Sequence, residues 1–123
     1  MTKKDWGDTA YRVSYTNYIN GHYVHPAVAN ITEHKITKLG SKYLYTDNTW
    51  TRYEIDTGRE DKDYGDRDTV FPSLKAAEYY VKRNFLLQTL AKYLNSAGVV
   101  VVREKTIEEM GEILRYFEPE ETE

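Results

Sequence analysis

The rest of the chain is organised around the stretch ITEHKITKLGSKYLYTDNTWTRYEIDTGRE, residues 31–60. Its apolar and aromatic residues come in three short runs, which Leu39-Gly40-Ser41 and Asp47-Asn48 separate. Runs rich in Tyr, Trp, Ile and Thr favour strands, whereas Gly, Asn, Asp and Ser favour turns. The stretch therefore predicts a meander of three antiparallel strands. The consecutive large residues Tyr43-Leu44-Tyr45 indicate a middle strand that is partly covered on both faces.

Ahead of the meander, the sequence predicts a β-hairpin. Residues 11–19 alternate large residues with polar ones, which is the period of a half-buried strand. Asn20-Gly21 is a strong signal for a type I′ turn, because both central residues of that turn need a positive φ. The return strand is expected over residues 22–25, since Pro26 cannot donate a hydrogen bond to a ladder.

The second half of the chain predicts a loop followed by a long helix. Residues 58–70 are rich in Asp and Gly and carry no apolar period, so they predict a surface loop. Ser73 is a good N-cap for a helix over residues 74–94. The apolar arc of that helix is too wide for an exposed helix. We expect it to be the main core helix, packed on the meander.

Two more elements complete the chain. The four valines at positions 99–102 predict a short buried strand over residues 99–103, after a helix stop in which Gly98 suits a left-handed C-cap. Thr106 and Glu109 have capping-box spacing at the start of an amphipathic helix that ends before Pro119.

Together these elements predict an α+β fold. We expect a small antiparallel β-sheet or partly closed barrel packed by one long helix, with a short C-terminal amphipathic helix. A length of 123 residues suits a single domain over residues 1–123. We expect residues 1–9 and 118–123 to be flexible, because neither segment shows an apolar period.

Composition narrows the class of protein. The hydrophobic fraction of 40% and the charged fraction of 30% are typical of a soluble globular protein. The chain has no cysteine, which excludes disulfides and thiolate chemistry. It has no signal-peptide pattern and no apolar run near the ~18 residues of a membrane span. We therefore expect a cytoplasmic protein that does not contact membranes.

No catalytic, metal or cofactor motif survives inspection. Asp56-Thr57-Gly58 lacks the small residue that follows the aspartic-protease triplet, and a second carboxylate is also needed. An EF-hand starting at Asp61 would place Asp66 and Pro72 where glycine and glutamate are required. We expect no enzyme activity, no metal and no cofactor.

A basic and aromatic group in the meander is the best candidate for a binding surface. Bases stack on such aromatics in small β-barrels, while cations neutralise phosphates. The balance of four bases against two acids over residues 31–53 is small for nucleic acid, however. A solvated sheet face whose aromatics half pack under the long helix is the other interpretation. The group consists of Lys35, Lys38, Lys42, Tyr43, Tyr45, Trp50 and Arg52.

The acidic C-terminal part supports a different hypothesis. Residues 104–123 hold eight acids and two bases, and the net charge of the whole chain is −3. Glu108, Glu109 and Glu112 lie on the polar side of the last predicted helix. They either mimic a phosphate backbone for a basic partner protein or form the solvated face of that helix.

The segment KITKLGSKYLYTDNTWTRYEIDTGRE, residues 35–60, and the following VFPSLKAA, residues 70–77, resemble small proteins of bacteriophages and prophages. In that family, whose function is unknown, a short SH3-like β-barrel precedes a helix. The resemblance covers residues 31–80 and implies a cytoplasmic protein of the infected bacterium that acts on host machinery or defence. It implies no catalytic residues.

Two functions therefore remain open. The leading hypothesis is a non-enzymatic binding protein, a phage-encoded inhibitor of a host protein such as a defence nuclease. The alternative is a small-barrel nucleic-acid-binding module that uses the basic and aromatic meander. The sequence leaves the oligomeric state open.

Overall fold

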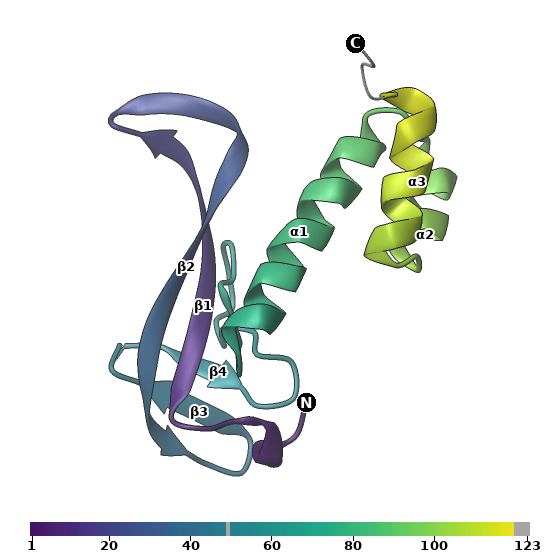
Figure 1. The fold of residues 1–123 in the computed structure, drawn as a ribbon. Helices are drawn as coiled ribbons and strands as arrows, with labels where there is room; N and C mark the ends of the chain where they lie inside the picture. Colours follow the sequence, from purple (N-terminus) through teal and green to yellow (C-terminus); the bar gives the residue numbers. More distant parts are fainter. Residues whose placement is uncertain (49, 120–123) are drawn as a thin grey trace. The chain divides into compact units, whose positions relative to one another are not determined.

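The computed structural model describes residues 1–48 and 50–119. It contains an antiparallel five-stranded sheet of order β4-β3-β2-β1-β5, together with three α-helices (Figure 1). This confirms the α+β fold class. The elements in chain order are the 3₁₀ helix η1 (Lys3–Asp5), β1 (Thr9–Ile19), β2 (His22–Leu39), β3 (Tyr43–Thr46), β4 (Arg52–Glu54), β5 (Thr69–Phe71), α1 (Leu74–Ala91), α2 (Ser96–Arg103) and α3 (Ile107–Phe117).

The chain forms two compact units, Met1–Glu78 and Tyr79–Glu123. The boundary lies within α1, whose first turn belongs to the unit that contains the sheet. Each unit has a buried apolar cluster of its own.

The N-terminal hairpin is much longer than the sequence indicates. The predicted turn is confirmed, since Asn20 and Gly21 have φ of 51° and 79°. The predicted end of the return strand at Pro26 is wrong, because β2 continues to Leu39. Pro26 lies where the β1–β2 register shifts, between the pairs Tyr18↔Tyr23 and Thr16↔Val28. A missing N–H costs little where the ladder is already interrupted. Figure 1 shows β1 and β2 as a long twisted ribbon that extends beyond β3 and β4.

The sheet closes into a nearly complete barrel through residues that were predicted to be a surface loop. Isolated β-bridges pair Tyr53 with Glu60 and Arg59 with Thr69. They join the two edge strands β4 and β5. The Asp61 amide donates to the Arg52 carbonyl over 2.9 Å, and the Val70 amide donates to the Gly58 carbonyl over 2.8 Å. The prediction of a loop over residues 58–70 is therefore wrong at both ends, because Arg59 and Glu60 form β-bridges and residues 69–71 are β5.

The barrel core includes the N-terminal segment. Trp6 is 6% exposed, and its indole Nε1 donates to the carbonyl of Ile55 over 3.0 Å. The Ile36 amide donates to the carbonyl of Asp8. The expectation of a flexible start thus missed a buried anchor, because a single tryptophan produces no periodicity. The core consists of Trp6, Ala10, Leu44, Tyr53, Ile55 and Val70, with Ile36 and Leu39 packed against them.

The other unit is a small helical core, and it corrects two predictions. The valines at 99–102 lie in α2 rather than in a strand. Gly98 lies inside this helix rather than at a left-handed C-cap, and its amide donates to the side chain of the N-cap residue Asn95 over 2.8 Å. The core consists of Leu90, Val102 and Met110, with Leu86, Leu87, Leu94, Ile113 and Leu114 packed against them.

The long helix therefore contributes its leucines to a helical core, whereas the sequence assigned them to packing on the meander. The N-cap prediction is confirmed, since the Ala76 amide donates to Ser73 Oγ over 3.1 Å. The capping box of Thr106 and Glu109 and the amphipathic α3 are confirmed as well. In the tail, Glu118 accepts a hydrogen bond from the Tyr93 hydroxyl over 2.8 Å, and residues 120–123 lie outside the described residues.

Candidate functional site

The outward side of β3 collects the cations and aromatic rings of the meander. Strand alternation buries Leu44 and Thr46 in the barrel, so Tyr43 and Tyr45 point outward and are half-buried. A register shift after Ile36 brings Lys38 opposite Tyr45, and Tyr45 is in turn opposite Arg52. The three strands β2, β3 and β4 thereby place a Lys-Tyr-Arg row across the sheet.

Three of the cations in this region lie over tyrosine rings. Lys38 Nζ is 5.5 Å from the centroid of the Tyr45 ring. Tyr43 has two cationic neighbours, because Lys42 Nζ is 5.3 Å and Arg52 Cζ is 4.0 Å from its centroid. Cation–π contacts at such exposed sites are each worth about 0.5–1 kcal/mol. We call Lys38, Lys42, Tyr43, Tyr45 and Arg52 the cation–aromatic cluster.

The barrel-closing segment holds the arginine of the cluster in place. Arg52 Nε donates to Asp61 Oδ2 over 2.7 Å, and the Arg52 carbonyl accepts from the Asp61 amide. The hydrogen bond to Asp61 raises the pKa of Arg52, which therefore stays charged. Asp61 is not among the seven residues that the sequence predicts for this surface. The local signal for it is the turn at residues 55–57, which folds residues 59–61 back antiparallel to β4.

The two lysines of the cluster keep their charges uncompensated. Within the described residues, neither Lys38 nor Lys42 has a carboxylate within 4.0 Å, and the same holds for Lys35. Lys35 is exposed on β2 opposite Thr9, before the register shift. Trp50 extends from the β3–β4 connection and is 95% exposed. The structure thus brings five of the seven predicted residues into direct contact and leaves Lys35 and Trp50 beside them along the chain.

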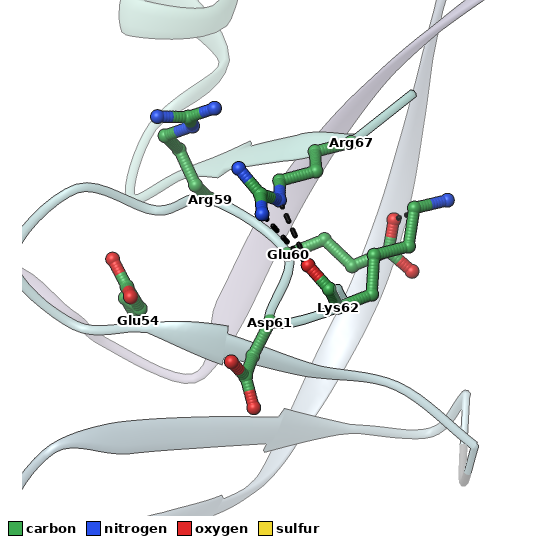
Figure 2. Close-up of a pocket in the computed structure, with 6 residues that line it drawn as sticks. All are labelled: Glu54, Arg59, Glu60, Asp61, Lys62 and Arg67. Carbon is green, nitrogen blue, oxygen red and sulfur yellow. Dashed lines mark hydrogen bonds and ion pairs between the residues drawn. The ribbon is translucent and has the colours of Figure 1, made fainter. Parts of the chain in front are cut away.

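A small pocket lies on the barrel-closing segment (Figure 2). Its volume of about 100 Å³ is below the roughly 300–1,000 Å³ of typical ligand sites. Arg67 Nε and a terminal nitrogen donate to the Lys62 carbonyl over 3.0 and 2.8 Å, while Lys62 Nζ is 3.6 Å from Glu60 Oε1. Figure 2 shows Arg59 and Asp61 pointing away from each other. Because the pocket is small and its Arg67 and Lys62 side chains bond to neighbouring lining residues, it is a structural feature of the closure. It is lined by Glu54, Arg59, Glu60, Asp61, Lys62 and Arg67.

Arg12 of β1 and Asp68, which precedes β5, form a partly buried ion pair. Arg12 Nε donates to Asp68 Oδ2 over 2.7 Å, and a terminal nitrogen of Arg12 donates to the same oxygen. Burial raises the pKa of the neighbouring Tyr53 to about 12, so its hydroxyl stays protonated at neutral pH. Among the described residues, no group of three His, Asp or Glu side chains is arranged to hold a metal ion.

The acidic residues of α3 are exposed, but one of them has a local role. Glu109 accepts a hydrogen bond from the Thr106 amide over 3.1 Å, which lowers the pKa of its carboxyl. Lys105 Nζ lies 4.0 Å from the same carboxylate. Glu108 and Glu112 are exposed on the same helix. Of the three acidic residues that the sequence proposed as a partner surface, Glu109 is therefore explained by helix capping.

Comparison with known proteins identifies the family. No curated protein and no solved structure matches the chain. No helix in the described part of the chain has both the length and the apolar content that crossing a bilayer requires. The family described as Phage ProQ C-terminal-like domain matches residues 1–122. This match confirms the phage association that the sequence resemblance implied. With its nearly closed β-barrel, the chain belongs to the Phage ProQ C-terminal-like domain family.

Proposed function

We propose that this protein is a binding module that holds single-stranded nucleic acid on its cation–aromatic cluster. The observation that carries the proposal is the pairing of uncompensated cations with outward tyrosine rings on β3. Single-strand binding requires this combination, since cations neutralise phosphates and rings stack on bases. The position of Trp50 supports the same function, because its exposed indole can stack on a base next to the cluster.

The charge distribution limits how tightly such a strand is held. Lys38 and Lys42 are available for phosphates, whereas Asp61 already pairs with Arg52. The net charge of −3 repels a polyanion at longer range. Each phosphate contact on a single strand contributes about −0.7 to the slope of log K against log salt. We therefore expect weak binding with a slope of about −1.4 to −2 for two or three contacts.

Fluorescence anisotropy with labelled single-stranded DNA and RNA tests the proposal. Lys38→Ala and Lys42→Ala should each weaken binding and make the salt slope shallower by about 0.7. Trp50→Ala should cost about 1–3 kcal/mol of binding free energy without a change of slope, because stacking releases no counterions. Lys92→Ala is the matched control, since Lys92 is an exposed lysine in the helical unit.

The same titration can contradict the proposal. Absence of binding to both nucleic acids at low salt would exclude it. Binding that is insensitive to salt, or that Lys92→Ala weakens as much as Lys38→Ala does, would exclude the cluster as the site.

A second candidate function is inhibition of a host protein such as a defence nuclease. The phage-associated family and the exposed acids Glu108 and Glu112 favour it. A nuclease binds the phosphates of nucleic acid with basic residues, and a row of carboxylates can take the place of those phosphates. The charge reversals Glu108→Lys and Glu112→Lys should then abolish capture of the host protein, whereas Lys38→Ala should leave capture unchanged. The opposite pattern would assign the host contact to the cluster.

A further inference from the structure

The hairpin carries an unusual stretch without charges. Residues 14–32 contain no Asp, Glu, Lys or Arg over 19 positions, although such residues make up 30% of the chain. These residues form the outer part of the β1–β2 ribbon, which we call the hairpin arm (Figure 1). Charged side chains, especially lysine, are the usual protection of an exposed strand edge. The hairpin arm lacks this protection.

The sheet leaves the edges of the hairpin arm open. The described pairing of β1 with β5 covers Tyr11–Val13, and that of β2 with β3 begins at Ile36. Towards the tip, both strands are irregular. The Tyr18 amide of β1 donates to Thr16 Oγ1 over 3.1 Å, and β2 contains Pro26. A bulge and a proline both discourage strand addition.

Below Pro26, β2 offers a regular edge. Residues 28–32 pair continuously with β1 on one side, from Thr16↔Val28 to Arg12↔Thr32. On their other side, no strand of the described chain pairs with them. Five residues at about 3.3 Å each give an edge of roughly 17 Å, the length of a typical strand. Asn30 lies exposed near its centre.

The hairpin arm also exposes large apolar side chains. Tyr18 and Tyr23 are 64% and 65% exposed and contact each other edge to face, with ring centroids 5.7 Å apart. Ile19 and Val28 are 44% and 43% exposed. Tyrosine supplies much contact area at low conformational-entropy cost. An open backbone edge beside such side chains has the properties of a protein interface.

We propose that the hairpin arm binds a second copy of this chain through the β2 edge, residues 28–32, with Asn30 of the two copies opposite each other. Charge complementarity selects this occupant. Nucleic acid would find no cation on the hairpin arm, and a charged peptide would bury charges without partners. The same arm of a second copy is equally neutral. Its edge is also self-complementary, because a twofold axis relates two antiparallel strands.

Self-association is independent of single-strand binding but has a consequence for it. A dimer carries two cation–aromatic clusters, so two weak contacts with one strand combine through a raised effective concentration. Self-association is measured without nucleic acid, and its failure would leave the cluster's own binding untouched.

Cysteine cross-linking tests the pairing directly, because the native chain has no cysteine. Asn30→Cys places one thiol at the centre of the proposed edge. Under mild oxidation it should form a disulfide-linked dimer, with a yield that rises with protein concentration. Tyr116→Cys is the control, since Tyr116 is 84% exposed on α3, and it should remain monomeric at the same concentrations. Equal cross-linking of both variants would overturn the proposal.

Sedimentation velocity supplies the second measurement. The unmodified chain should shift from monomer to dimer with rising concentration. Asn30→Lys should weaken the dimer at least roughly tenfold, because two lysines then face each other across the twofold axis. Val101→Lys adds the same charge at a valine that is 60% exposed on α2 and should leave the dimer unchanged. A chain that stays monomeric at every concentration would overturn the proposal, as would equal weakening by both lysines.

Discussion

At the scale of single residues, Gly58 determines whether the barrel can close. It is buried with a φ of 73°, and a Cβ at this position would overlap the carbonyl oxygen of Val70. That residue's amide bonds to the Gly58 carbonyl, so neither strand can retreat without breaking the closure. We expect Gly58→Ala to lower the free energy of unfolding by at least about 2 kcal/mol, measured by urea unfolding with tryptophan fluorescence.

The matched control for Gly58→Ala is Gly21→Ala. Gly21 has a φ of 79°, but no atom lies within 4 Å of the position that a Cβ would take. This variant should therefore lose only about 1 kcal/mol of unfolding free energy, because alanine is less favourable than glycine at a positive φ. Equal losses in the two variants would mean that close approach to Val70 is not the reason for glycine at position 58.

Strand alternation predicts some residues of the site and not others. Outward Tyr43 and Tyr45 follow from their places on either side of the buried Leu44. The partner of Arg52 does not follow, because the pattern predicts a loop from residue 58 onward, whereas the turn at residues 55–57 brings Asp61 back beside Arg52. Periodicity describes one element at a time, whereas a site assembled by barrel closure depends on which edges meet.

At the scale of elements, α2 shows how composition can mislead. Four consecutive valines favour a strand by propensity, since β-branched residues are slightly unfavourable in helices. A run without polar interruptions matches both periods, however. The structure selects the helix, in which Val102 is buried while Val100 and Val101 are 61% and 60% exposed. The N-cap Asn95 was the signal that should have outweighed the valines.

Removal of that cap tests the explanation. Asn95→Ala loses the hydrogen bond from the Gly98 amide and should cost about 1 kcal/mol of stability. Because the following valines have weak helix propensity, amide exchange should accelerate first over residues 98–100. Asn95→Asp keeps an accepting oxygen and should exchange like the native chain. Unchanged exchange in Asn95→Ala would mean that packing of Val102 alone holds the helix.

At the scale of the whole molecule, the fold class was predictable but the division of the core was not. The meander, the hairpin turn and both helix caps follow from local residue chemistry. The wide apolar arc of α1 indicates that this helix is buried, and the sequence predicts that the sheet buries it. Leu86, Leu87 and Leu90 instead pack in the helical core. An amphipathic pattern states that a side chain is buried and does not identify the partner that buries it.

The two cores share no residue, which leads to a prediction about the cooperativity of unfolding. Leu90→Ala should cost about 2–5 kcal/mol in the helical core. Both tryptophans, Trp6 and Trp50, belong to the unit that contains the barrel, so their fluorescence reports on that unit. We expect Leu90→Ala to shift the helical transition seen by far-UV circular dichroism and to leave the fluorescence transition unchanged. Leu44→Ala in the barrel core should do the reverse. Coincident shifts in both signals would mean that α1 couples the two cores into one cooperative unit, because only a connection that transmits the loss of packing can move both transitions together.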